Sequence, residues 1–262
     1  REHDPEFIHQ LRISQRRLRA LLKLFAPALP ADFVNHWNEQ LRSNAAQFGA
    51  ARDLDVLASE IVATVQTVSD AERTAVDALY QRVGTARDEA RERTQQQLDP
   101  AQQGRLVLAL AAALHDLPRN PLLAAVDMRL FIDVRLSRLS RKVRRQHKAA
   151  RSMVPADLHK LRIDIKQLRY GLEFFASLIP GKALGAYLRS ITRTQTALGF
   201  IQDVDTARTL LTELAGTDAA LCRAAGFVCG WHGPRYRKLS RKTMRKLKRL
   251  LWSPAPWQAP PR

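Results

Sequence analysis

Apolar positions along this chain recur at three- and four-residue spacing, the period of an amphipathic α-helix, and no segment shows the alternation of a half-buried strand. Proline and glycine fall between the apolar segments, where helices usually end. Long helices joined by short loops are typical of up-and-down bundles. The pattern therefore predicts an all-α fold with helices at 5–26, 31–48, 52–68, 71–97, 101–116, 121–151, 156–178, 182–200, 203–215, 218–230 and 235–251.

Two stretches 150 positions apart share one pattern of residues. HQLRISQRRLRALLKLF begins at His9 and HKLRIDIKQLRYGLEFF begins at His159. The matched positions further along are Pro30 and Pro180, Trp37 and Tyr187, Gly49 and Gly199, and the pairs Asp53–Asp55 and Asp203–Asp205. We predict an internal duplication, in which 1–262 is a single domain of two pseudo-symmetric helical bundles. The halves are expected at 1–152 and 153–251, with a Pro/Trp-rich tail at 252–262.

Each opening helix of the two copies carries an apolar stripe beside a cationic row. The row follows the stripe by one residue, which is about 100° around a helix. The stripes are Ile8, Leu11, Gln15, Leu18, Leu22 and Phe25, and Leu158, Leu161, Ile165, Leu168, Leu172 and Phe175. The rows are His9, Arg12, Arg16, Arg19 and Lys23, and His159, Arg162, Lys166 and Arg169. A cationic row in this position is expected to line the groove between packed helices.

Each half also ends with a strongly basic helix that contains the sequence LSRK. The rows are Arg135, Arg138, Lys142 and Arg145 on 121–151, and Arg235, Lys238, Lys242 and Arg245 on 235–251. A second row on 121–151 leaves open which face is turned inward: Arg141, Arg144, Lys148 and Arg151. A single basic helix is usually a solvated face whose side-chain stems cover the core. Four such helices would repel one another unless an anion lay among them.

The charge balance supports a polyanionic partner. Lys and Arg number 43 against 25 Asp and Glu, which gives a net charge of +18. Such an excess favours nucleic acid, an anionic membrane surface or a phosphate-rich polymer. Aromatic residues make up only 6% and are almost absent from the cationic rows, so a platform for stacking single-stranded bases is not indicated. No stretch is long enough to span a bilayer, and the spacing of Cys222 and Cys229 is typical of buried thiols.

These residues carry a family resemblance over essentially the whole chain. HQLRISQRRLRALLKLF followed by GAARDLDVL, and LHKLRIDIKQLRYGLEFF followed by LGFIQDVDTARTLL, resemble the CHAD domain, the conserved histidine α-helical domain. The resemblance implies two pseudo-symmetric helical bundles around a basic central cavity or pore, with inorganic polyphosphate as the ligand. We expect binding without catalysis, and no metal or cofactor. Two positions depart from the pattern, because Glu173 stands opposite Lys23 and Gln202 stands opposite Arg52.

On this resemblance the basic rows become polyphosphate contacts. The expected set is His9, Arg12, Arg16, Arg19, Lys23, Arg135, Arg138, Lys142, Arg145, His159, Arg162, Lys166, Arg169, Lys238, Lys242 and Arg245. Members of the family are often fused to a CYTH-type triphosphatase domain, which would lie outside this chain. Some associate with polyhydroxyalkanoate granules, so we expect a bacterial, cytoplasmic protein for which the granule surface is a further candidate partner.

Two other functions compete with this interpretation. A general polyanion-binding or nucleic-acid-binding helical protein would also carry a charge of +18, although here we expect nucleic acid only as a non-specific competitor. A metal-dependent phosphohydrolase would need the paired carboxylates Asp53, Asp55, Asp203 and Asp205. We interpret these pairs instead as residues that begin a helix after a glycine, where carboxylates favour the helix dipole and can hold an arginine.

Overall fold

The computed structural model describes residues 5–67, 69–117, 127–179 and 181–258, and in these ranges it contains helices and no strand, which confirms the all-α prediction. Short helical turns lie at Ala26–Ala28, Leu57–Val62, Ala150–Ser152 and Ala176–Leu178. The longer helices are α1 (Pro5–Phe25), α2 (Ala31–Ala46), α3 (Gly49–Val56), α4 (Asp70–Gln97), α5 (Pro100–His115), α7 (Met128–Ala149), α8 (Pro155–Phe174), α9 (Lys182–Ala215) and α10 (Ala219–Leu251).

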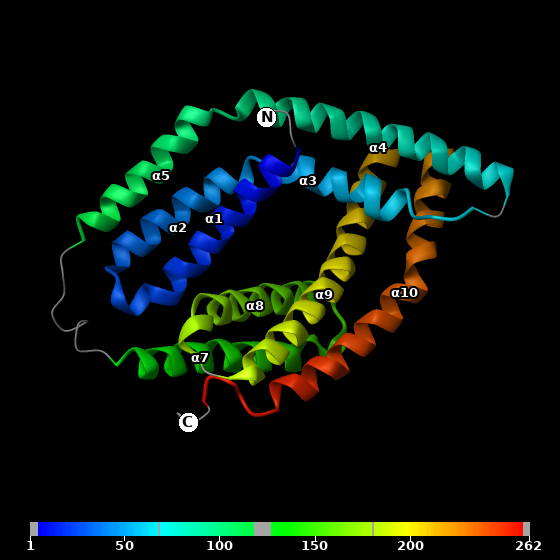
Figure 1. Cartoon of the computed structure of the whole chain (residues 1–262). Helices are drawn as coiled ribbons and strands as arrows, with labels where there is room; N and C mark the ends of the chain where they lie inside the picture. The colour runs from blue at the N-terminus through cyan, green and yellow to red at the C-terminus, as the bar shows by residue number, and fades with distance from the viewer. Residues whose placement is uncertain (1–4, 68, 118–126, 180, 259–262) are drawn as a thin grey trace.

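The helices pack along the chain and across it. α1 pairs with α2, α3 with α4, α7 with α8, and α9 with both α8 and α10. α4 crosses the upper edge of the view in Figure 1 and reaches α10, while α7 lies along the lower edge. α1 also contacts α8, so the two opening helices of the repeated sequence lie against each other. α7 falls in the predicted first half of the chain, but it packs chiefly against α8.

Two apolar clusters hold these helices together. The larger one joins residues of α3 and α4 to residues of α7, α8, α9 and α10, and includes Leu79, Leu136, Ile165 and Ile191. The smaller one lies between α1, α2 and α5 and contains Leu22, Trp37, Leu41 and Leu110. The larger cluster therefore contains residues from both halves of the chain.

The two opening helices bury their apolar stripes to different extents. All six stripe residues of α8 are buried, with exposed fractions between 0 and 3%. In α1 only Gln15 and Leu22 of the predicted stripe are buried, and the amide of Gln15 donates to Gln103 Oε1 of α5 at 3.3 Å. α8 lies inside the bundle, whereas α1 is nearer its edge.

Two predicted helix breaks are wrong. α9 runs unbroken through Gly199 and α10 runs through Gly230, Gly233 and Pro234. Glycine costs a helix about 1 kcal/mol and an interior proline about 3 kcal/mol. Burial outweighs these costs, because Leu198, Ile201 and Val204 continue the buried face of α9, and Val228, His232 and Tyr236 do so in α10. His232 also bonds through Nε2 to the carbonyl of Ile61, at 3.0 Å.

The tail after α10 is partly docked on the bundle. The Trp257 ring is buried, and its Nε1 donates to Ser137 Oγ of α7 at 3.2 Å. Trp252 stays 47% exposed, with the Arg144 guanidinium 5.6 Å from its ring centre. Predicted helix positions 121–126 and the last four residues of the tail lie outside the described residues.

Two smaller expectations can be compared with the structure. No helix within the described ranges combines the length and the apolar character that a membrane crossing requires. Cys229 is half-buried, but Cys222 is exposed on the first turns of α10, so the expected pair of buried thiols is wrong. The spacing of seven places both thiols on one face of the helix, and that face reaches the surface at its N-terminal end.

The burial pattern of α8 gives a direct test of the fold. Ile165→Ala should lower the free energy of unfolding by about 2–5 kcal/mol, because Ile165 is fully buried and its truncation leaves a cavity. Ile163→Ala is the matched control, since Ile163 is 40% exposed on the same helix, and it should change stability by less than about 0.5 kcal/mol. Urea unfolding followed by circular dichroism measures both, and equal losses would contradict the assigned face of α8.

Candidate functional site

Cations of both opening helices come together where α1 contacts α8. Arg12 and Arg16 extend from α1, and Arg162 and Lys166 extend from α8; we call these four residues the central cluster. Burial lowers the pKa of Lys166 to about 7, and the charges of Arg162 and Arg16 lower it further in the same direction. A lysine reaches such a value only where its ammonium is desolvated and surrounded by like charge. The fold therefore keeps the positive charges of the central cluster close together in spite of their mutual repulsion.

The guanidinium groups of the central cluster are incompletely satisfied. Burial also lowers the pKa of Arg12 and of Arg162. Arg12 donates through Nη1 to the carbonyl of Phe48. Within the described chain, the buried Nε atoms of Arg16 and Arg162 have no hydrogen-bond acceptor. Unpaired buried donors of charged groups are costly, so an anion that accepted from them would stabilise the cluster.

Both repeated glycines lie beside an arginine of this cluster. A Cβ at Gly49 would lie 3.4 Å from Arg12 Nη1, and one at Gly199 would lie 3.9 Å from the Nε and Nη2 of Arg162. A Cβ at either position would therefore make only ordinary van der Waals contact with the guanidinium. Each glycine of the repeated pattern thus lies close to an arginine of the central cluster.

The first carboxylate of each Asp pair lies at the edge of the cluster. Burial raises the pKa of Asp53, and the charges of Arg12, Arg52 and Arg162 oppose that rise. Burial likewise raises the pKa of Asp203, against the charges of Arg162 and Lys166. Cations outnumber the two carboxylates around the crossing, so these acids order the arginines without neutralising the cluster.

The second carboxylate of each pair accepts a hydrogen bond from a side chain of a neighbouring helix. Asp55 Oδ1 accepts from Arg91 of α4, at 3.0 Å from Nε and 2.5 Å from Nη2. Asp205 Oδ2 accepts from the hydroxyl of Tyr236 in α10, at 3.1 Å. The expected hold on an arginine is thus seen at Asp55, and also at Asp205, whose Oδ1 lies 3.3 Å from Arg208 Nη1. The expected position at the start of a helix is wrong for both pairs. α9 continues through Asp203 and Asp205, and Asp53 and Asp55 lie beyond the first turn of α3.

The described residues contain no group of three His, Cys, Asp or Glu side chains arranged to hold a metal ion.

The two repeated histidines can be described only in part. The side chain of His9 lies outside the described part of α1. His159 is exposed, and its Nδ1 lies 2.6 Å from Gln202 Oε1, so Nδ1 carries the proton and Nε2 is left for another partner. Gln202, which stands opposite Arg52 in the repeat, therefore orients a histidine of the predicted set. Both residues line a groove of about 770 Å³ with Asp205 and Arg208.

A second basic feature is the groove between the end of α1 and α7. Its volume is about 760 Å³, and its cations are Lys23, Arg135, Arg138, Arg141, Lys142 and Arg145. We call it the α7 groove. It brings together five residues of the predicted set and adds Arg141 from the second row, so the inward face of α7 takes cations from both rows. Burial lowers the pKa of Lys23, and the charges of Arg19 and Lys142 add to this effect, so Lys23 links the α1 row to the α7 row.

Some predicted cations already have partners. Arg135 donates to the carbonyls of Leu24 and Lys23 at 2.7 Å each, and so caps the C-terminal end of α1. Lys142 forms an ion pair with the buried Asp164 at 2.7 Å. These two residues fix α7 to α1 and α8 while still lining the α7 groove.

The ends of the two opening rows are also engaged within the protein. Arg19 Nε donates to Asn38 Oδ1 at 3.3 Å. Arg169 lies 3.3 Å from Glu173, the residue that replaces a base in the second row, and Arg17 lies at the same distance from that carboxylate. The departure at Glu173 thus neutralises one end of the second row.

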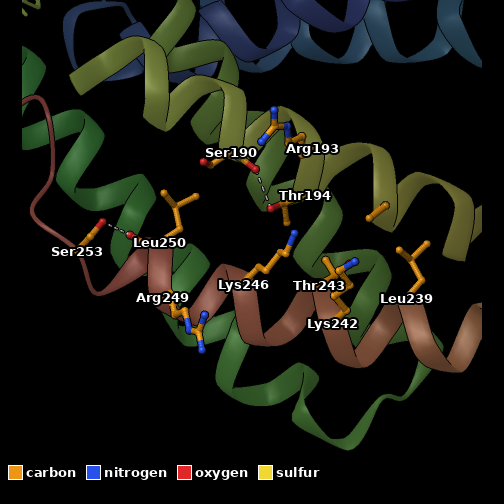
Figure 2. Close-up of a pocket in the computed structure, with 11 residues that line it drawn as sticks. Ser190, Arg193, Thr194, Leu239, Lys242, Thr243, Lys246, Arg249, Leu250 and Ser253 are labelled. Atoms are coloured by element: carbon orange, nitrogen blue, oxygen red, sulfur yellow. Dashed lines mark hydrogen bonds between the residues drawn. The ribbon is translucent and has the colours of Figure 1, made fainter. Parts of the chain in front are cut away.

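The structure separates the cations of α10 from the other predicted residues. Lys242 lines a pocket between α9 and α10, shown in Figure 2, together with Arg193, Lys246 and Arg249. Arg245 lines a different groove, between α7 and α10, with His147. Lys238 lines none of the described grooves. Lys246 and Arg249 follow Lys242 at helical spacing, so the sequence pattern could have indicated that they share a face with Lys242. Nothing in the sequence indicates that Arg193 lies beside them.

Comparison with known proteins identifies the family. The model of the CHAD domain matches residues 1–212. The crystal structure of the CHAD domain from the plant Ricinus communis is similar, with a TM-score of 0.74 and 28% sequence identity over 93% of this chain and 82% of that chain. No curated protein matches the sequence. Because the family model covers well over half of the chain, the chain belongs to the CHAD domain family.

Proposed function

We propose that this chain binds inorganic polyphosphate without catalysis, in a basic cavity between two pseudo-symmetric halves. The observation that carries the proposal is the central cluster, in which half-buried cations of α1 and α8 lie together, and in which burial and then the charges of Arg162 and Arg16 lower the pKa of Lys166 to about 7. A polyanion is the ligand that removes this repulsion. The CHAD family is associated with polyphosphate, which agrees with the chemistry of the site.

The two-fold arrangement of the site supports the proposed duplication. α1 and α8 contribute Arg12 and Arg162 at matched positions, and Gly49 and Gly199 lie beside those two guanidinium groups. Asp55 and Asp205 each hold a side chain of a following helix, α4 in one half and α10 in the other. In the second half the continuous α9 takes the places of α2 and α3 together.

Polyphosphate matches these cations better than a nucleic acid does. It is a flexible chain with about one negative charge per phosphate and no bases, so it needs many charged donors and no stacking surface. Each charged hydrogen bond contributes about 1.5–3 kcal/mol before the costs of desolvation and ordering. Lys23 connects the central cluster, through Arg19, with the α7 groove. A long chain could therefore bind both features at once.

We propose in addition a cellular role for this binding. A cytoplasmic protein, attached to a polyhydroxyalkanoate granule or fused to a triphosphatase, could use such a site to recruit polyphosphate.

A competition titration tests the choice of ligand. The protein is loaded with labelled long-chain polyphosphate at physiological salt and challenged with duplex DNA, single-stranded RNA or ATP. We expect unlabelled polyphosphate alone to displace the label at low concentration, because only a flexible phosphate chain can follow the buried cations. Equal displacement by DNA or RNA per charge would favour the general polyanion surface and contradict the proposal.

A charge-reversal pair tests the position of the site. Arg16→Glu with Lys166→Glu should abolish polyphosphate binding while leaving helicity unchanged, because it puts two carboxylates among the donors of the central cluster. Arg73→Glu with Arg93→Glu makes the same change in net charge on α4, where both arginines are more than 60% exposed. This control should retain most of the affinity in a fluorescence titration. A folded central variant with wild-type affinity would overturn the site assignment.

The pKa of Lys166 predicts proton uptake on binding. At pH 8 a lysine with a pKa of about 7 is mostly neutral, and a bound phosphate raises that pKa, so binding should take up about one proton. Affinity should therefore increase as pH falls from 9 to 7 and then level off. Calorimetry in buffers of different ionisation enthalpy measures the uptake. Lys166→Arg is the control, since it keeps the charge but cannot titrate, and uptake equal to wild type in this variant would contradict the assignment.

A further inference from the structure

The pocket between α9 and α10 differs from the basic features already described. Its volume is about 550 Å³, and Figure 2 shows Thr194 of α9 and Lys246 of α10 turned toward the space between the two helices. Its cations are Arg193, Lys242, Lys246 and Arg249, and no carboxylate lines it. We call it the α9–α10 pocket. Its lining includes none of the central cluster and none of the α7 groove.

The cations of this pocket are not neutralised inside the protein. Within the described chain, none of the four forms an ion pair or a hydrogen bond with another residue. This differs from the α7 groove, where Arg135 and Lys142 are engaged by backbone carbonyls and by Asp164. Four unpaired cations around one pocket attract an anion. Because they are exposed and have no partner among the described residues, they break no existing contact when they bind it.

The floor of the pocket offers an unused hydroxyl. Thr194 and Thr243 are both buried, with exposed fractions of 6 and 4%. Thr194 Oγ1 donates to the carbonyl of Ser190 at 2.9 Å, drawn as a dashed line in Figure 2. Ser240 does the same one turn along α10, to Tyr236 at 2.7 Å. Thr243 has no such bond within the described chain, so its hydroxyl is available to a ligand.

The walls of the pocket are not those of a simple phosphate channel. Leu239 and Leu250 of α10 and Ala197 of α9 line it beside the cations. An inorganic phosphate chain gains nothing from apolar walls, whereas an organic group removes them from water at about 25 cal/mol per Å². Pockets of about 300–1,000 Å³ with apolar walls and a few polar groups are typical of small-molecule sites.

We infer that the α9–α10 pocket binds a small organic phosphate. The phosphate would be held by Lys246 and its neighbouring cations, the organic group would lie against Leu239 and Leu250, and Thr243 would donate to a ligand oxygen. This site is separate from the proposed polyphosphate cavity and does not depend on it. It would give the protein two anion sites with different ligands, one for a polymer and one for a compact molecule.

ATP is the probe that we would use to test this inference. Binding is measured by calorimetry with the full chain carrying Arg16→Glu and Lys166→Glu, so that the central cluster does not contribute. We expect one ATP per chain. Lys246→Met should weaken binding at least about tenfold, and Thr243→Val about fivefold, which are the losses of a charged and of a neutral hydrogen bond. Lys248→Met is the matched control, since Lys248 lines the groove on the other side of α10 and should change affinity less than about twofold.

Three results would overturn the inference. They are no binding of ATP, an equal loss in the Lys246→Met and Lys248→Met variants, or binding of inorganic tripolyphosphate as tight as that of ATP. If the charge-reversal background does not fold, Arg16→Gln with Lys166→Met replaces it, since neither of these substitutions adds a buried negative charge. Labelled polyphosphate bound to the wild-type chain should be unaffected by Lys246→Met. A failure of the organic-phosphate site is therefore distinguishable from a failure of the polyphosphate site.

Discussion

The burial of like charges where α1 meets α8 is the constraint on which this structure depends. A desolvated cation without an anion is destabilising, and here several half-buried cations lie together. Among the described residues, Asp53 and Asp203 are the carboxylates that oppose them. The stripe of α8 offsets that cost, because its six apolar residues are almost fully buried, and each such side chain contributes about 1.5–3 kcal/mol. The apolar face of α8 thus fixes this helix in the bundle. Its cationic face, with Arg162 and Lys166, does not need to contribute to stability. The cluster can then remain unsatisfied until a ligand arrives.

The sequence predicted the helices well where apolar spacing alone decides the structure. The stripe of α8 was predicted in full, because every stripe position of that helix meets another part of the protein. The predicted breaks near Gly199 and Pro234 are absent, because burial outweighs local helix propensity at both places. Tertiary packing holds both residues in continuous helices at a cost of about 1–3 kcal/mol, and the partners that compensate are distant in sequence. Ile61, whose carbonyl bonds to His232, is one such partner.

The candidate site was predictable to a similar degree. A helical wheel places Arg12 and Arg16 on one face of α1, and Arg162 and Lys166 on one face of α8, and the repeat indicated that the two faces were equivalent. Periodicity could not show that Arg135 would turn to the end of α1, or that Arg169 would lie beside Glu173. Nor could it place Arg193 beside Lys242, because α9 and α10 meet only through the fold. Spacing gives the face of a helix, and only packing shows what that face meets.

The buried and exposed cations should respond to different conditions, and this contrast separates the two proposed sites. At the central cluster burial shifts the pKa values of Arg12, Arg162 and Lys166, so the binding energy there includes the return of a proton to Lys166. Solvent screening is weak in such a place. The cations of the α9–α10 pocket are exposed, so salt should strongly weaken their attraction for an anion. A ligand of the central cluster is therefore recognised by its ability to compensate buried charge. A ligand of the α9–α10 pocket must instead gain its specificity from the buried Thr243 and the apolar walls, because its charges alone would not distinguish it from other anions in the cell.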